Sequence, residues 1–445
     1  MRKILLATAA SMGTLLAAAG NANAQPVKPV APGTILVHLN GYFQAGMNEF
    51  GSTFNNYGGS KLNPVTGNGE FRLYPGFDAM TVNGIAYGVQ VETRTAFTPA
   101  NKGVNNNVGS LYVRRAYGYI GMPDYGYVRI GQTDGAFTLS QVGVIEQFGD
   151  GNQFAGPDTV PYYVIPTRAQ VGEFAYADQG ALYGTNKVVL ISPAFDEPYL
   201  GGKFSMMASY EPNSNGLKQG YGSYCGGGTA GYATCAGLTS YSGTFAGTNL
   251  AVERRNTFDV SASYAVSLDG FANKISVSYL QGAPVNYTGG AYTSSTAGYF
   301  LNELQVMQVG VQTTYKGLFL DSDAVTLGAN VKWGQTLDGY AAKPIGARNA
   351  LTYIVGGNYV VGPYVLGASF FDAQTAGNYN PTMAGKEART LSEYGLAVGG
   401  NYVIGRDLSL YLQYMYAHSH QPGNTNLLNG NTQLHMVSAG GTFKW

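Results

Sequence analysis

The chain has 445 residues, a formal net charge of +0 at pH 7 and a mean hydropathy of −0.07. Charged residues make up 11% of it, against about 25% in soluble globular domains, and 64 residues are glycine. The balanced charge gives no support for nucleic-acid binding. This composition argues against a soluble enzyme and is typical of a transmembrane β-barrel, whose residues alternate between lipid and water.

The first residues have the features of a secretory signal peptide. A basic start, Met1-Arg2-Lys3, precedes an apolar stretch over residues 4–19 and the small-residue motif Ala22-Asn23-Ala24. We expect residues 1–24 to be cleaved and residues 25–445 to form a single barrel domain. No later run approaches the about 20 apolar residues of a membrane-spanning helix. The exported chain is therefore expected to contain no transmembrane helix.

Apolar and polar residues alternate from residue 37 onwards. In the first segment the apolar face is formed by Val37, Leu39, Phe43, Ala45 and Met47, and the polar face by His38, Asn40, Tyr42, Gln44 and Asn48. The same period of two recurs in residues 87–97, 258–266, 307–315, 325–333, 408–416 and 437–445. This period predicts strands that lie between an apolar and an aqueous phase. Tyrosines near the predicted strand ends fit interfacial girdles: Tyr112, Tyr117, Tyr119, Tyr279, Tyr315, Tyr402, Tyr414 and Tyr416.

The predicted connections alternate between short and long. Short turns are expected near residues 83–84, 123–124, 196–202, 269–270, 316–317, 362–363 and 405–407. Long loops are expected near residues 49–68, 98–109, 133–184, 212–252, 282–302, 337–349, 374–389 and 421–432. We therefore predict an all-β fold, a transmembrane antiparallel β-barrel of about sixteen strands with both termini on the short-turn rim. Closure is required because an open sheet edge in lipid would leave backbone groups unpaired.

One connection, residues 133–184, is too long for an ordinary loop. It carries the apolar run 137–145 together with Glu146, Asp150 and Asp158. A loop in water would seldom keep so many apolar side chains. We therefore predict that it folds back into the barrel, with its acids facing arginines on the wall, which would make the protein a pore. The loop 212–252 is expected to be extracellular.

Several segments, taken in order, resemble the Gram-negative general porin family. They are Val37-His38-Leu39-Asn40-Gly41-Tyr42, then residues 113–121 with their hairpin into 127–132, the long third loop, and the C-terminal residues 441–445. The resemblance implies a homotrimer of sixteen-stranded barrels in the Gram-negative outer membrane, in contact with its lipids and lipopolysaccharide. It also implies passive diffusion of ions and small hydrophilic solutes past a third loop that narrows the lumen.

The family's pore constriction sets acids of the third loop against basic residues of the wall. Arg72 and Arg114 match family wall positions, Arg94 and Arg129 have inward parity, and Glu146 and Asp150 are placed across from these four. Four arginines against two or three acids would favour anions weakly. Tyr42 stands where several members have a basic residue, which leaves selectivity open. Phe443 and the terminal Trp445, in place of the usual phenylalanine, are the expected signal for the barrel-assembly machinery.

Adjacent residues on a strand point to opposite faces, so Arg114 and Arg115 are not expected to face the lumen together. Arg114 is the expected lumen residue, and Arg115 would lie at the rim or at a subunit contact. Cys225 and Cys235 are the only cysteines, and in an oxidising compartment we expect a disulfide between them rather than a metal site. His418-Ser419-His420 has no third ligand nearby in the sequence, so no metal site is predicted.

The catalytic motifs G-x-S-x-G, P-loop and H-E-x-x-H are absent from the sequence. We therefore expect no enzyme activity and no cofactor. Two other functions remain open. A substrate-specific channel, for example for sugars, would line its lumen with aromatic rings such as Tyr42 and Tyr411, and a non-conducting barrel would carry loop 212–252 as an adhesive or receptor element.

Overall fold

The computed structural model describes residues 31–52, 56–57, 60–61, 63–96, 112–151, 154, 185–199, 201–214, 254–284, 301–337, 340, 342–343, 345–376, 390–420 and 431–445. Most of them lie in strands. The strands are β1 (Ile35–Ser52), β2 (Asn56–Tyr57), β3 (Ser60–Lys61), β4 (Val65–Met80), β5 (Ala86–Ala96), β6 (Tyr112–Met122), β7 (Gly126–Thr133), β8 (Thr185–Ile191), β9 (Phe195–Asp196), β10 (Lys203–Asn213), β11 (Arg254–Leu268), β12 (Phe271–Pro284), β13 (Leu304–Lys316), β14 (Ala324–Gln335), β15 (Ala350–Val361), β16 (Tyr364–Ala376), β17 (Thr390–Val403), β18 (Leu408–His420) and β19 (Asn431–Lys444). A short helix, α2 (Ala136–Leu139), follows β7.

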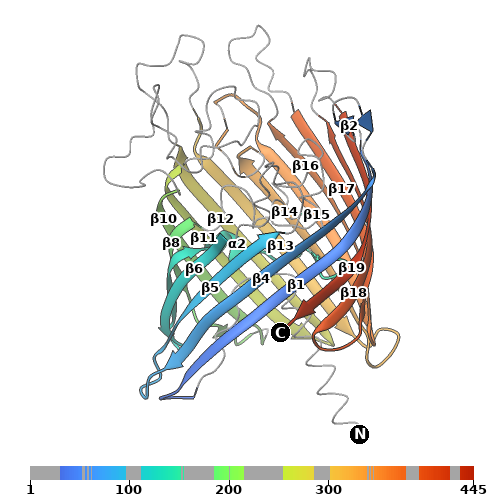
Figure 1. Ribbon diagram of the computed structural model, residues 1–445. Helices are drawn as coiled ribbons and strands as arrows, with labels where there is room; N and C mark the ends of the chain where they lie inside the picture. The colour runs from blue at the N-terminus through green and yellow to red at the C-terminus, as the bar shows by residue number, and fades with distance from the viewer. Residues whose placement is uncertain are drawn as a thin grey trace.

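The strands close into one antiparallel barrel (Figure 1). Each strand pairs with the next along the chain, and β1 completes the circle by pairing with β4 on one side and β19 on the other. The sheet counts 17 strands. Since β8 and β9 both pair with β10 as successive pieces of one wall strand, the barrel has 16. The predicted fold and strand number are confirmed.

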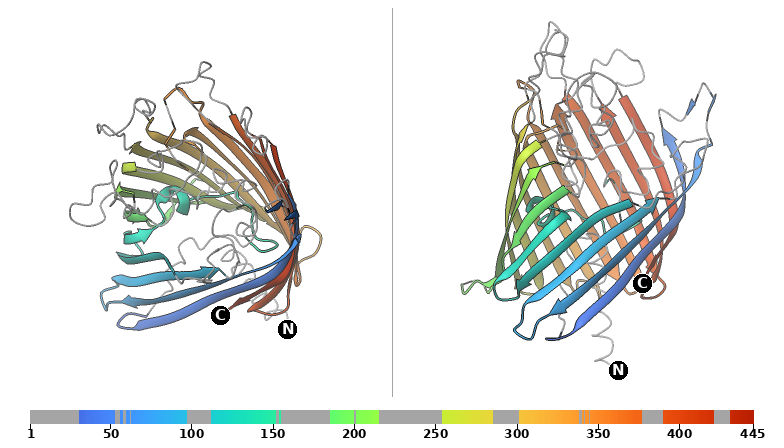
Figure 2. Two further views of the ribbon diagram at one scale, coloured as in Figure 1. Left: turned by 45° about the horizontal axis from the view of Figure 1, so that its top comes forward. Right: turned by 60° about the vertical axis from the view of Figure 1, so that its left-hand side comes forward.

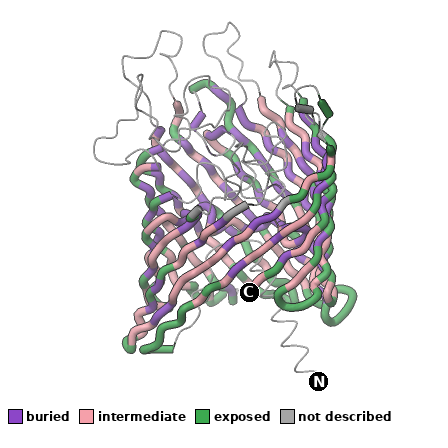
Figure 3. The backbone as a smooth tube through the Cα atoms, in the orientation of Figure 1, coloured by how far each residue is buried: buried purple, intermediate pink, exposed green. Residues whose placement is uncertain are grey.

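The two faces of the wall differ as the alternation predicted. On β1, Val37 is 77% exposed and Leu39 60%, whereas Gln44 and Asn48 on the other face are buried. The wall therefore shows alternating exposed and buried positions along its strands (Figure 3). An apolar outer face suits lipid, and closure satisfies the backbone groups that lipid cannot. Among the described residues no helix is long and apolar enough to cross a membrane.

The short turns lie together at one rim of the barrel, beside the C-terminus and the start of β1 (Figures 1 and 2). The turn between β13 and β14 is longer than expected, because β13 ends at Lys316 and β14 begins only at Ala324. The loop 212–252 lies outside the described residues apart from 212–214. The proposed signal peptide 1–24 and both cysteines, Cys225 and Cys235, also lie outside them.

A β-bulge interrupts the pairing of β5 with β6. Glu92 pairs with Arg115 and the next residue, Thr93, pairs with Val113, so Arg114 is an extra residue in the register. Such an extra residue reverses the inward and outward alternation beyond it. Val113 accordingly points outward, 47% exposed, while Arg114 and Arg115 are both buried.

The bulge also explains why two tyrosines were assigned to the wrong face. Tyr119 is buried inside the barrel, where its hydroxyl donates to the carboxylate of Asp78. Tyr117 lies on the same face of β6, and the guanidinium of Arg129 stacks over its ring at 5.0 Å from the centroid. Neither tyrosine is part of the lipid-facing girdle.

Candidate functional site

The chain turns into the lumen directly after β7. We call residues 134–151 the constriction segment, the described part of the predicted inward loop. Its start is fixed to the inner wall by two backbone N–H groups: that of Phe137 donates to Asp259 Oδ2 at 2.8 Å, and that of Ala136 donates to Ser209 Oγ at 3.2 Å. Both acceptors belong to neighbouring strands, β10 and β11.

The segment then follows the inner wall around much of the barrel. Amides of the wall hold its carbonyl groups: Asn330 on β14 donates to Val142 O at 2.8 Å, and Asn401 on β17 donates to Gly149 O at 2.6 Å. At its far end, Asp150 reaches β18 and β1. Its N–H donates to Gln413 Oε1 at 3.1 Å, and its carbonyl accepts from Gln44 Nε2 at 3.2 Å.

Apolar side chains beneath the segment explain its unusual sequence. Ile145 and Phe148 are buried against inward-facing apolar residues of β15 to β18, among them Ile354, Phe371 and Met415. The run that looked too apolar for a loop in water is therefore a small hydrophobic core inside the barrel. Its burial supplies the free energy that keeps the segment on the wall.

One glycine permits the closest approach of segment and wall. Gly143 has φ +86, a conformation that L side chains rarely adopt, and a Cβ there would collide with the carbonyl oxygen of Ala329 on β14. Any larger residue at position 143 would lift the segment from the wall.

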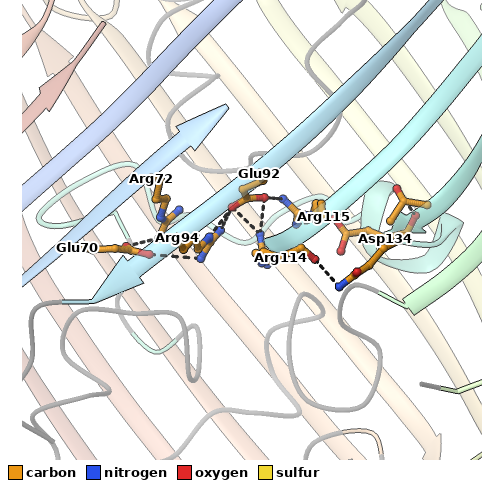
Figure 4. Close-up of polar contacts among 9 residues, drawn as sticks. Glu70, Arg72, Glu92, Arg94, Arg114, Arg115 and Asp134 are labelled. Carbon is orange, nitrogen blue, oxygen red and sulfur yellow. Dashed lines mark hydrogen bonds and ion pairs between the residues drawn. The ribbon is translucent and has the colours of Figure 1, made fainter. Parts of the chain in front are cut away.

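A row of charged side chains lines the wall of β4, β5 and β6 (Figure 4). We call it the arginine cluster, formed by Arg72, Arg94, Arg114 and Arg115 with Glu70, Glu92 and Asp134. Arg72 Nη2 lies 2.6 Å from Glu70 Oε2, and Arg94 Nη1 lies 3.6 Å from Glu70 Oε1. Arg94 also forms an ion pair with Glu92. The carboxylates thus alternate with guanidinium groups along the wall.

Glu92 is the centre of the cluster, because it also pairs with both residues of the bulge. Its Oε2 lies 3.4 Å from Arg114 Nη1 and 2.8 Å from Arg115 Nη1. Arg115 Nη2 reaches Asp134 Oδ2 at 2.5 Å and so links the cluster to the start of the constriction segment. The expectation that only one of the two arginines faces the lumen was wrong, since it assumed unbroken alternation on β6.

The two acids of the segment occupy different positions around the barrel. Glu146 lies beside Gln147, which accepts from Asn358 on β15 at 3.1 Å, and β15 is eight strands away from β6 in a barrel of 16. Glu146 therefore lies on the side of the barrel opposite β6, and its role at a pore constriction stays a prediction. Asp150 was expected there too, but it is held by β18 and β1, next to β4.

Tyr42 joins Asp150 to the cluster. Its ring lies under the guanidinium of Arg72, at 5.1 Å from the centroid. Its hydroxyl donates to Gln44 Oε1 at 2.5 Å, and Gln44 in turn holds the carbonyl of Asp150. The segment and the cluster together thus form an almost continuous polar belt around the lumen.

A second charged network was not found from the sequence. On β8, β10 and β11, Glu211 accepts a hydrogen bond from Arg254 Nη2 at 3.0 Å and lies 3.3 Å from Lys187 Nζ, which also donates to Thr133 O at 3.3 Å. The signal for Glu70 and Glu92 was present, because each stands two residues before a predicted arginine and hence on the same face of its strand. No comparable pairing predicted the Lys187 network.

The remaining predicted residues lie apart from the belt. Arg129 faces inward but is nearer the short-turn end of β7, over Tyr117. Phe443 and Trp445 are on the outer surface, 46% and 51% exposed. No cluster of three or more metal-ligating side chains occurs within the described ranges.

A closed barrel of this size leaves an aqueous lumen that side chains alone do not fill. Its outer face is apolar and its inner face carries a belt of charges. These features define the class of protein: a transmembrane channel.

Comparison with known proteins gives the family. A family model described as Gram-negative porin matches residues 7–422, and the chain therefore belongs to that family of outer-membrane channels. A triple mutant of Rhodopseudomonas blastica porin is 13% identical with a TM-score of 0.45, covering 92% of this chain and 100% of that one. OmpT of Vibrio cholerae, described as a trimer form, is 10% identical with a TM-score of 0.49, covering 93% and 100%. No curated protein matches the chain.

Proposed function

We propose that this porin is a general diffusion channel for ions and small hydrophilic solutes, and that the belt forms its narrowest cross-section. The observation that carries the proposal is the path of residues 134–151, which are bonded to the inner wall from β10 round to β1. On this path Glu146 would face the arginine cluster across the lumen. Opposed charges across a narrow aqueous gap create a transverse field that orients dipolar solutes and disfavours bulky apolar ones.

Charge balance in the belt indicates weak ion selectivity. Four guanidinium groups and three carboxylates give the arginine cluster a formal net charge of +1. Glu146 and Asp150 add two negative charges elsewhere on the belt. The acids Glu70, Glu92 and Asp134 therefore offset most of the anion preference that the arginines alone would produce.

The experiment is single-channel conductance and reversal potential in a planar bilayer under a salt gradient, for wild type, Glu146→Gln and Asp150→Asn. Steady ohmic conductance is expected, with selectivity shifted towards anions in Glu146→Gln. Unchanged selectivity in both variants would mean that the narrowest cross-section lies elsewhere in the lumen. Absence of conductance from folded barrels would overturn the proposed channel function. It would favour a non-conducting barrel that carries loop 212–252 as an adhesive or receptor element.

A sugar-specific channel is less well supported. Such a channel needs aromatic faces open to the lumen, but Tyr411 is only 4% exposed. The ring of Tyr42 is covered by the guanidinium of Arg72, and its hydroxyl donates to Gln44. We therefore retain the general diffusion channel.

We further propose a homotrimer whose subunits meet at the part of the barrel wall formed by β7 and β8, where the strands are short. A tilted transmembrane strand needs about 9–11 residues. In the described part of the chain β7 has 8, and its neighbour β8 has 7 before the wall strand is interrupted and continues as β9. Their outward residues are apolar, with Ile130 60% and Leu190 52% exposed. Cover by a second copy would protect this short stretch of wall.

Export and assembly complete the proposal. Cleavage after residue 24 would release the mature chain, Phe443 and Trp445 would be recognised by the barrel-assembly machinery, and lipopolysaccharide would surround the long-loop rim. Cys225 and Cys235 would form a disulfide in loop 212–252. Mass spectrometry of the purified mature protein, before and after reduction, tests both the cleavage and the disulfide.

A further inference from the structure

The turn between β13 and β14, residues 317–323, presents three large apolar side chains at its tip. Leu318 is 47% exposed, Phe319 74% and Leu320 54%. Three consecutive apolar residues at the tip of a short turn would be an aggregation liability if the turn projected into water. The turn lies at the short-turn rim and bows sideways from the barrel (Figures 1 and 2, light orange).

A buried carboxylate holds the turn in this shape. Asp323 accepts from the backbone N–H groups of all three apolar residues, at 2.7 Å from Leu318 N, 2.9 Å from Phe319 N and 3.1 Å from Leu320 N. The turn closes with Gly317 N donating to Asp323 O at 2.9 Å. The backbone donors of the tip are thus satisfied internally, which is the condition for placing a chain segment in a medium without water.

The tip is continuous with the lipid-facing surface of the barrel. The ring of Phe319 packs edge-on against Tyr359 at 5.9 Å, and the Tyr359 hydroxyl donates to Asp323 Oδ2 at 2.9 Å. Tyr359 pairs with Val325 in the register of β14 and β15. It therefore shares the outer face with Leu327, which is 55% exposed.

We propose that this turn is a lipid anchor that inserts its tip, Leu318-Phe319-Leu320, into the periplasmic leaflet of the outer membrane. Short turns of bacterial barrels lie on the periplasmic side, and a sideways turn there meets the acyl chains before it meets water. A second copy of the chain is a poorer fit for this turn. The proposed subunit contact is at β7 and β8, and β10, β11 and β12 separate the turn from β8. The inference does not depend on the proposed constriction.

Depth-dependent fluorescence tests the anchor. The variant Phe319→Trp is folded into phosphatidylcholine vesicles with or without brominated acyl chains, and the emission of Trp333 and Trp445 in wild type is subtracted. The introduced indole is expected to emit at short wavelength and to lose most of its intensity in brominated vesicles. The variant Leu320→Trp serves as a second reporter should the first variant fold poorly.

The matched control is Tyr125→Trp, in the tight turn between β6 and β7, where the native side chain is 82% exposed and follows Asp124 instead of standing in an apolar run. The indole of this control is expected to emit at long wavelength and to resist quenching. Emission from both tip variants that is indistinguishable from that of the control would place the tip in water and overturn the proposal. Shielding of both tip reporters from water without quenching by brominated lipid would also overturn it, in favour of a protein partner.

Discussion

The indole ring of Trp445 lies on Gly41, in the space that a side chain at residue 41 would occupy. The two residues also exchange backbone hydrogen bonds, from Gly41 N to Trp445 O at 3.0 Å and from Trp445 N to Gly41 O at 3.2 Å. The indole packs further against Phe71, at 6.1 Å between ring centroids. The last residue of the chain thus completes the seam at which β19 meets β1.

We expect Gly41→Ala to weaken this seam. The added methyl group collides with the indole, and overpacking of this kind costs about 1–3 kcal/mol. The temperature at which the barrel loses its heat-modifiable mobility on gels should fall. Gly51→Ala is the matched control on the same strand, because nothing lies within 4 Å of a Cβ there. Trp445→Phe in the Gly41→Ala background should restore part of the loss; equal stability of the two alanine variants would contradict the packing argument.

Glu92→Gln should shift ion selectivity towards anions. It removes the carboxylate shared by Arg94, Arg114 and Arg115 and raises the formal charge of the cluster by one unit. A unit charge about 4 Å from a permeating ion is worth about 1 kcal/mol in water, or a change in the ion ratio on the order of fivefold. Reversal potentials at low salt, where screening is weak, measure the shift. Asp124→Asn, in an exposed turn, is the control and should leave the ratio unchanged.

Asp259→Ala should loosen the constriction segment at its start. The carboxylate accepts from Phe137 N and from Ser209, and a hydrogen bond to a charged group contributes about 1.5–3 kcal/mol. Current fluctuations should increase, and liposome swelling should admit larger sugars than wild type does. Asp259→Asn keeps an acceptor oxygen and should resemble wild type more closely. A quiet, unchanged channel in the alanine variant would show that the apolar contacts of Ile145 and Phe148 suffice.

The turn at 317–323 should respond to acid. Burial acts to raise the pKa of Asp323, but the hydrogen bonds from Phe319, Tyr359, Leu320 and Leu318 outweigh it and hold the pKa below its ordinary value. A lowered pKa in the folded state stabilises the turn above the unfolded value of about 3.9, and the contribution is lost as pH falls towards the folded pKa.

Emission of the Phe319→Trp variant in vesicles should therefore stay constant from neutral pH to about pH 4 and then change on further acidification. In Phe319→Trp/Asp323→Asn this change should be absent, because the amide does not titrate. The same acid transition in both variants would assign it to another group.

The sequence itself determined the barrel. Alternation with a period of two, as in Val37 and Leu39 against Gln44 and Asn48, reflects a local rule: successive side chains on a strand point to opposite faces. The alternating loop lengths then set the topology, and the apolar run before Glu146 predicted that the third loop leaves water. These features depend on neighbours along the chain, so a single sequence records them.

Only the tertiary structure decided how the site is assembled. The bulge at Arg114 arises from the pairing of two strands, and it brings Arg115 to Glu92 against the local parity rule. The partners of Asp150 are set by how far the segment travels along the wall, over amides supplied by distant strands. A contact between residues far apart in sequence depends on strand register and on the path of the chain. The local sequence around each of the two residues determines neither.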